Sequence, residues 1–191
     1  MAVACSLSAF KTTFSEALDS VRKMGFRHVD LICIPGWNHI VPADLADDFD
    51  GQAARVEELL AENNLEPVAM NCGIPATYQR DEETVAERNC QVEALARLAE
   101  RLGVGVASFY PGYKVEDRPW QEVLDDSAES CREMIQIGAE HGVVFAIELH
   151  YNTPVQTLEQ CSYLLEEVPE LMVAYDPSHF AMQGIDLRNT A

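Results

Sequence analysis

The chain has 191 residues, of which 13 are Lys or Arg and 32 are Asp or Glu, so its formal net charge is −19. Its contents of 48% hydrophobic and 24% charged residues are ordinary for a folded protein and exclude wholesale disorder. Because phosphate groups are bound by clustered Lys and Arg side chains, the acidic balance disfavours a nucleic acid or an anionic membrane as a partner.

The six cysteines are spread along the chain without a Cys-x-x-Cys pair. We therefore expect free thiols in a reducing cytosol, not disulfides or a zinc knuckle. The sequence opens without the pattern of a signal peptide, and no apolar run reaches the ~18 residues of a membrane span. These features predict a cytoplasmic protein.

Short β-branched or apolar runs recur along the chain and predict strands. Several of them are apolar on consecutive residues, which is typical of parallel strands that are buried on both faces. The runs are Ala2–Ser6, His28–Ile34, Pro67–Cys72, Val104–Tyr110, Val143–Leu149 and Leu171–Tyr175.

Between these runs the apolar residues take a helical period. The first helix is predicted to begin at Thr13, which has capping-box spacing to Glu16, and to end at Gly25. A second amphipathic stretch ends at Leu102, and a third follows Trp120. A fourth is predicted to begin with Thr153 as N-cap, because Pro and Gln occupy its first and third positions.

The alternation of strands and helices predicts an α/β fold with right-handed crossovers, in one domain that covers residues 1–191. Two architectures fit this pattern. An open, doubly wound parallel sheet would be complete in this length, whereas a (β/α)8 TIM barrel needs about 250 residues and would be incomplete, with six βα units present. The glycine fingerprint of dinucleotide-binding sheets is absent, because Gly103 and Gly105 precede a strand and do not follow one.

Ligands bind at the carboxyl ends of parallel strands in both architectures, so position along a strand selects the candidate site residues. His28 and His141 lie at strand starts and are set aside. Glu148 and Asp176 end two consecutive strands and would converge on one small volume, where two carboxylates need a proton or a cation between them. Carboxylates with an imidazole suit Mn²⁺, Mg²⁺, Co²⁺ or Zn²⁺. The other strand-end candidates are Asp30, Trp37, His39, Asn71, Tyr110, His150 and His179.

Structural roles compete with these functional ones. Glu148 could accept hydrogen bonds from the helix that begins near Thr153, and Asp176 could cap the turn that Pro177 starts. The histidines could be hydrogen-bonded loop residues, Asp30 could form a hydrogen bond in the core, and the aromatic residues could serve packing alone.

Two segments resemble one family. Ile147-Glu148-Leu-His150-Tyr-Asn-Thr153-Pro154 and Val173-Ala-Tyr-Asp176-Pro-Ser-His179 resemble the xylose isomerase-like TIM-barrel superfamily of sugar and sugar-phosphate isomerases and epimerases. The segment from Gly25 to Asp30 is similar to the start of that family's second strand.

The resemblance implies a TIM barrel that holds one divalent metal ion through Glu148 and Asp176. It implies that Glu148 moves a proton next to the carbonyl of a sugar or small hydroxy-carbonyl compound, through an enediolate. His179 would contact substrate oxygens. The remaining residues expected to bind the substrate are His150, Trp37, His39, Asn71 and Tyr110.

Two departures from the family pattern qualify these expectations. The family's other two metal ligands, a His and a Glu of the seventh and eighth strands, are not in this sequence, which implies weak metal binding and impaired turnover unless another chain supplies them. Free-ketose 3-epimerases carry a substrate-binding Glu where Pro154 stands here. This favours a hydroxypyruvate isomerase-like, inosose dehydratase-like or sugar-phosphate isomerase-like member.

Two other classes of function remain as alternatives. The chain could be a non-catalytic, truncated barrel, or a subunit whose free first and sixth strand edges pair with a partner or with a second copy in a homo-oligomer. An endonuclease IV-type DNA repair enzyme shares the barrel, but it needs a His-rich trinuclear zinc site, and the acidic charge disfavours DNA.

Overall fold

The computed structural model describes residues 3–37, 39–186 and 188 of the chain. Its centre is one sheet of six parallel strands whose spatial order is the order of the sequence. A doubly wound sheet would place its first strand in the middle. The observed order is instead that of a TIM-barrel-type sheet, so the barrel prediction is confirmed and the doubly wound alternative is wrong. The strands are β1 (Ala4–Ser6), β2 (His28–Cys33), β3 (Glu66–Cys72), β4 (Val106–Phe109), β5 (Val144–Glu148) and β6 (Met172–Ala174).

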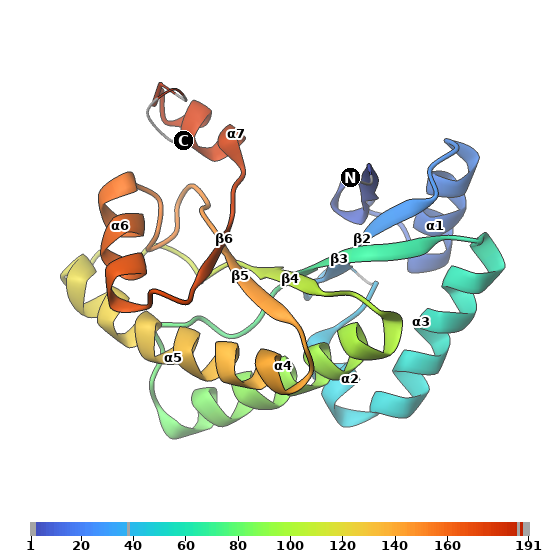
Figure 1. Ribbon diagram of the computed structural model, residues 1–191, viewed down its shortest axis with the longest axis horizontal. Coiled ribbons are helices and arrows are strands. Elements are labelled where there is room, and N and C mark those ends of the chain that lie inside the picture. Colours follow the sequence, from blue (N-terminus) through green and yellow to red (C-terminus); the bar gives the residue numbers. More distant parts are fainter. Residues whose placement is uncertain (1–2, 38, 187, 189–191) are drawn as a thin grey trace.

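Helices cover the outer side of this curved sheet. Figure 1 shows them arranged around the arc from α1 to α6, with both chain ends at the top of the view, on the side where the arc is open. The helices are η1 (Leu7–Ala9, a 3-10 turn), α1 (Phe14–Lys23), α2 (Pro42–Asp47), α3 (Phe49–Asn63), α4 (Glu82–Leu102), α5 (Trp120–Glu140), α6 (Leu158–Glu167) and α7 (Pro177–Met182).

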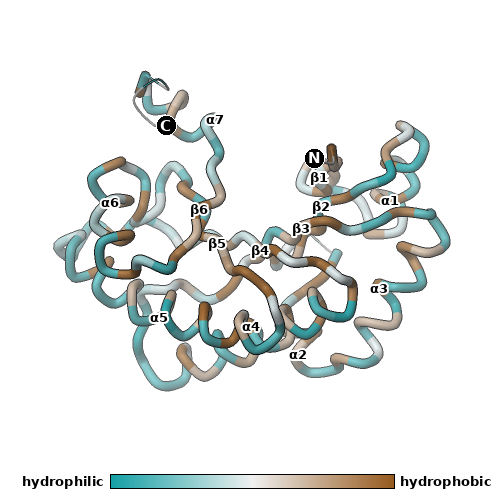
Figure 2. The backbone as a smooth tube through the Cα atoms, viewed as in Figure 1, coloured by the Kyte–Doolittle hydropathy of each residue, from teal (hydrophilic) through white to brown (hydrophobic). Residues whose placement is uncertain are grey.

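The hydrophobic core lies between the outer face of the sheet and these helices. Leu31, Met70 and Phe145 of the strands and Leu18 and Leu95 of the helices have exposures of 0 to 2%. Figure 2 shows the strands as the most hydrophobic part of the backbone trace and the outer helices as largely hydrophilic. Each helix is therefore held mainly by its apolar stripe on the sheet.

Helix α5 approaches the sheet most closely at Gly138. A Cβ atom at this position would lie 2.8 Å from the ring of Phe145 and would also meet the carbonyl oxygen of Val143. Only glycine therefore fits between the end of α5 and β5.

The cap of the first helix is confirmed, but the predicted start of the fourth is wrong. Thr13 and Glu16 form the expected capping box of α1. Helix α6 begins at Leu158 with Thr157 as its N-cap, whereas the Thr153 hydroxyl donates to the carbonyl of His150 at 2.7 Å and closes a turn. The sequence contains two T-x-x-Q boxes in succession, and the turn after β5 uses the first one.

None of the helices in the described residues combines the length and the apolar character of a membrane span.

Candidate functional site

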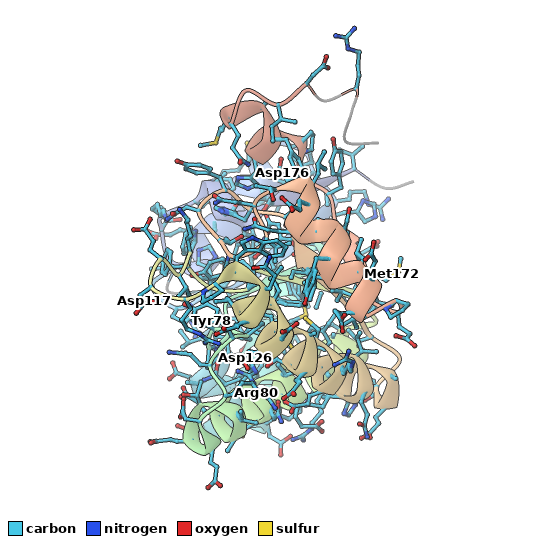
Figure 3. All side chains as sticks on the ribbon, turned by 90° about the vertical axis from the view of Figure 1, so that its left-hand side faces the viewer. Tyr78, Arg80, Asp117, Asp126, Met172 and Asp176 are labelled. Atoms are coloured by element: carbon cyan, nitrogen blue, oxygen red, sulfur yellow. The ribbon has the colours of Figure 1, made fainter. Side chains whose placement is uncertain are left out.

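The carboxyl ends of the six strands lie on one side of the sheet. Figure 3 shows Tyr78 and Asp117, from the loops after β3 and β4, on the left side of the molecule. Met172, at the amino end of β6, lies on the right side. Because all the strands are parallel, the side chains that follow them are brought to one face.

Three side chains on this face converge. Glu148, His150 and His179 each offer a ligand atom, and these atoms all lie within 4.8 Å of one another. The Nε2 atom of His179 is 3.5 Å from Oε1 of Glu148 and 3.6 Å from Oδ2 of Asp176. The rings of His150 and His179 are tilted against each other, with their centroids 3.7 Å apart. One cluster thus forms from Glu148 of β5, His150 of the following loop and His179 of α7, with Asp176 beside them. We call it the Glu148 cluster.

Local hydrogen bonds hold the Glu148 cluster in place. Glu148 is the last residue of β5, and its Oε2 accepts a hydrogen bond from Nδ2 of Asn71 at 3.2 Å. Nδ1 of His150 lies 2.7 Å from the carbonyl oxygen of Tyr151. Since a carbonyl only accepts, Nδ1 carries the proton, which makes Nε2 of the neutral ring the acceptor or ligand atom.

Asp176 positions His179 through a helix cap. Its Oδ1 accepts from the backbone N–H of Ser178 at 2.8 Å, which makes Asp176 the N-cap of α7. Residues three apart on a helix share a face, so His179 is brought back toward the carboxylate. The capping role expected for Asp176 is therefore confirmed, whereas Glu148 bonds to Asn71 and not to the segment near Thr153.

The Glu148 cluster fits a divalent cation. Two ligands that bind one ion at ~2.1 Å are roughly 3.0 to 3.4 Å apart in octahedral or tetrahedral geometry, close to the 3.5 and 3.6 Å measured around Nε2 of His179. Carboxylate oxygens and imidazole nitrogens are donors that Mn²⁺, Co²⁺ and Zn²⁺ accept. Nδ1 of His179 is buried without a hydrogen-bond partner, and Nε2, which faces the carboxylates of Glu148 and Asp176, is the nitrogen of this ring that could bind a cation.

Burial and neighbouring groups shift the pKa values of two acids near the strand ends, Asp30 and Asp176, in opposite directions. Burial raises the pKa of Asp30, and the charge of Glu148 adds to the rise, against a hydrogen bond from Ser6. Burial also acts to raise the pKa of Asp176, but the hydrogen bonds from Ser178 and the nearby histidines outweigh it and lower that pKa. Asp176 is thus held as a carboxylate, whereas Asp30 in the barrel interior is pushed toward its neutral form.

A cavity of about 740 Å³ opens above the strand ends. Most of the residues selected from the sequence line it. They are Trp37, Asn71, Tyr110, Glu148, His150, Asp176 and His179. Tyr110 packs edge-on against the ring of His150 at 6.1 Å, and burial, with Tyr113 beside it, raises the pKa of Tyr110 to about 12.

His39 lies elsewhere. It is 4% exposed, its ring is tilted against that of Phe14 with the centroids 5.7 Å apart, and its Nε2 lies 3.1 Å from the carbonyl oxygen of Thr12. It does not line the cavity. Burial lowers its pKa.

The sequence pattern did not indicate two polar residues of α4 that line the cavity. Glu87 and Gln91 are one turn apart, and Nε2 of Gln91 donates to Oε1 of Glu87 at 2.9 Å. Glu87 lies off the apolar stripe of α4, so the helical periodicity of the sequence alone assigns it to a solvent-exposed face. The E-x-x-x-Q spacing was the available signal, but it is common on exposed helices.

Comparison with known proteins agrees with the topology. A family model described as xylose isomerase-like TIM barrel matches residues 18–190. No curated protein matches the chain by sequence.

Solved structures share the fold at low sequence identity. The IOLI protein with a bound zinc atom is 19% identical, with a TM-score of 0.73 over 98% of this chain and 67% of that chain. The 3-keto-D-glucoside 4-epimerase from E. coli is 16% identical, with a TM-score of 0.72 over 99% of this chain and 73% of its own. D-psicose 3-epimerase from Clostridium cellulolyticum H10, solved with D-tagatose, is 15% identical, with a TM-score of 0.73 over 95% of this chain and 65% of its own. The chain thus spans about two thirds of the length of these proteins.

Proposed function

The chain belongs to the xylose isomerase-like TIM-barrel family, and from this membership and its strand-end geometry we propose that it acts on a sugar or a related hydroxy-carbonyl compound. The Glu148 cluster would bind one divalent cation and support proton transfer at the carbon next to the carbonyl. The observation that carries the proposal is the convergence of ligand atoms from Glu148, His150 and His179 within 4.8 Å.

The structural neighbours support both parts of the proposal. One neighbour has a zinc atom bound and another is a complex with magnesium. Others are epimerases solved with D-tagatose, D-fructose or D-allulose. A cation held by Glu148 and its neighbours would polarise a carbonyl oxygen and so favour loss of the adjacent proton.

The protein's own groups have distinct parts in this chemistry. Asn71 holds one oxygen of Glu148, which leaves Oε1 directed toward the His179 side of the cavity. In this geometry the carboxylate can take or return a proton at a bound carbon without reorienting. His150 and His179 can hydrogen-bond to substrate hydroxyl groups on the same side. Tyr110, whose raised pKa keeps it neutral, can donate to a further oxygen.

Titration of the purified chain with Mn²⁺ in a calorimeter tests the metal site. We expect Glu148→Gln and Asp176→Asn to weaken binding, the former by at least about tenfold, because an amide replaces a charged ligand oxygen. Glu166→Gln on α6 is the matched control, since it removes one exposed carboxylate far from the strand ends. Equal binding by all four proteins would show that the Glu148 cluster is not a metal site.

Proton transfer can be measured without knowing the product. Keto sugars such as D-fructose and D-tagatose are incubated with the Mn²⁺-loaded chain in D₂O, and NMR follows exchange of the carbon-bound proton next to the carbonyl. We expect exchange with the parent and none with Glu148→Gln. Exchange that is equally fast in the variant would exclude Glu148 as the proton-transfer group.

A further inference from the structure

The cavity extends well beyond the Glu148 cluster. The cluster is built at β5 and β6, whereas Trp37 follows β2, and β2 lies three strands away from β5 in the sheet. At ~4.8 Å per strand this is a path of roughly 14 Å along the arc. A single hexose would fill roughly a quarter of the 740 Å³ at the packing density of protein interiors. The cavity therefore has space for a second ring.

The far part of the cavity has a defined composition, and we call it the Trp37 compartment. It is lined by Ile34, Pro35, Trp37, Ile74, Glu87 and Gln91. It lies at the ends of β2 and β3, which are flanked in the sheet by β1 on one side and by β4 on the other.

Trp37 is held in a fixed orientation. Its Nε1 donates to the carbonyl oxygen of Ser8 at 3.3 Å, and the ammonium group of Lys11 lies 3.1 Å from the ring centroid. The side chain is half-buried and lines the cavity. A fixed aromatic ring with aliphatic neighbours is a surface on which the apolar face of a sugar or an aryl ring can stack.

One polar pair borders this apolar surface. Gln91 is only 6% exposed, and its amide donates to Glu87 at 2.9 Å. The pair presents carboxylate and amide oxygens at the cavity, which can accept hydrogen bonds from ligand hydroxyl groups. A surface with aromatic, aliphatic and acceptor groups suits a polyhydroxylated ring better than a purely apolar ligand.

The charges around the cavity disfavour anionic ligands. Three carboxylates, from Glu87, Glu148 and Asp176, are among its lining residues, and no Lys or Arg is among those that the structure describes. Two cations near the cavity are already engaged: the Lys11 ammonium lies on the Trp37 ring, and the fully buried Arg88 donates to the carbonyl oxygens of residues 76 and 79. Together with the net charge of −19, this arrangement repels phosphate and carboxylate groups.

We propose that the Trp37 compartment binds the second ring of an uncharged glycoside, while the first ring reaches the Glu148 cluster. The preferred substrate class is then a neutral glycoside with a keto group on its first ring, ahead of a free monosaccharide, a sugar phosphate or a sugar acid. This rests on the proposed function only in placing a sugar at the Glu148 cluster.

Calorimetry with matched ligands tests the compartment. The probes are the methyl and phenyl β-D-glycosides of glucose and galactose, together with glucose and glucose 6-phosphate, each added to the Mn²⁺-treated chain. We expect the phenyl glycoside of at least one sugar to bind about tenfold more tightly than its methyl counterpart, because only the phenyl ring can reach Trp37. Glucose 6-phosphate should bind no more tightly than glucose.

The two tryptophans of the chain offer a matched pair of variants. Trp37→Ala should abolish the preference for the phenyl glycoside, whereas Trp120→Ala should retain it, because Trp120 is also half-buried but does not line this cavity. If Trp37→Ala does not fold, Trp120→Phe leaves Trp37 as the sole tryptophan, and its fluorescence should change with the phenyl glycoside more than with the methyl one. Equal binding of the two glycosides, binding of neither, or tighter binding of the phosphate would overturn the proposal.

The two proposals can fail separately. The phenyl preference should persist in Glu148→Gln, since the compartment lies apart from the Glu148 cluster. If Glu148→Gln and Asp176→Asn bind Mn²⁺ as tightly as the parent does, while the parent still prefers the phenyl glycoside, the proposed function alone is refuted. Normal Mn²⁺ binding without the preference would refute the second-ring site alone.

Discussion

Replacing the buried Arg88 by methionine should destabilise the fold and loosen the loop that borders the cavity. Arg88 is 0% exposed, and its Nη1 donates to the carbonyl oxygens of Ala76 and Gln79, both at 3.1 Å. These two bonds tie the loop after β3 to helix α4. Methionine keeps the unbranched apolar stem and removes only the charged donor.

The magnitude follows from two opposing effects. A hydrogen bond from a charged donor contributes about 1.5 to 3 kcal/mol, so the loss of two amounts to about 3 to 6 kcal/mol. Part of this is recovered, because Nε and Nη2 of Arg88 lack hydrogen-bond partners and burial lowers the pKa of the guanidinium. We therefore expect a net loss of about 2 to 4 kcal/mol, or on the order of 8 °C in Tm for a domain of this size.

Urea unfolding, followed by far-UV circular dichroism, measures this loss, and limited proteolysis reports on the loop. Arg55→Met on α3 is the matched control, since Arg55 is an exposed arginine in a helix interior, and its replacement should change stability by less than about 0.5 kcal/mol. If Arg88→Met were as stable as the parent protein, the desolvation of the guanidinium would balance both hydrogen bonds, and the reasoning about the loop would be refuted.

Three further predictions concern other parts of the fold. His141→Gln should lower Tm below about pH 6.5 and have little effect near pH 9. The hydrogen bond with Glu100 raises the pKa of His141, and the stability that the protonated ring contributes is lost as pH rises through that raised value. An equal loss of Tm at both pH values would contradict this. Gly138→Ala should cost about 1 to 3 kcal/mol in urea unfolding, because its Cβ would press on the backbone and a core ring, whereas Gly105→Ala, whose Cβ meets nothing within 4 Å, should be neutral or slightly stabilising. Asn71→Leu should weaken Mn²⁺ binding about tenfold by freeing the glutamate at the end of β5, without a comparable loss of stability, and unchanged affinity would remove Asn71 from the site.

The periodic elements of the fold could be predicted because each has a local cause. The Thr13 box places the start of α1, and the apolar runs place all six strands within a few residues. The order of the strands has no local cause, since it depends on how the crossovers fold back on the sheet. Periodicity therefore left two architectures open, and only the family resemblance favoured the barrel order that the structure shows. The stretch from Pro42 to Asn63, which forms α2 and α3, lacks a long uninterrupted stripe, and neither helix was predicted.

The candidate site could be predicted only as far as strand ends identify it. Position at the carboxyl end of a strand identifies Glu148 and Asn71, and a hydrogen bond joins them. His39 was selected by the same rule, but the chain turns after β2 and buries it against Phe14. Glu87 and Gln91 could not be selected, because whether a helix face meets solvent or a cavity depends on the loop beside it.

Capping and metal binding by Asp176 compete as interpretations of the sequence, but the structure makes the two roles compatible. The cap uses Oδ1, which accepts from the N–H of Ser178, whereas Oδ2 is the oxygen that lies 3.6 Å from Nε2 of His179. Asparagine retains a carbonyl oxygen that can cap the helix, but it loses the charge that a cation requires. Asp176→Asn therefore separates the roles: it should leave Tm nearly unchanged while Mn²⁺ binding weakens. Asp176→Ala should lower both, because removal of the cap also releases α7 and with it His179.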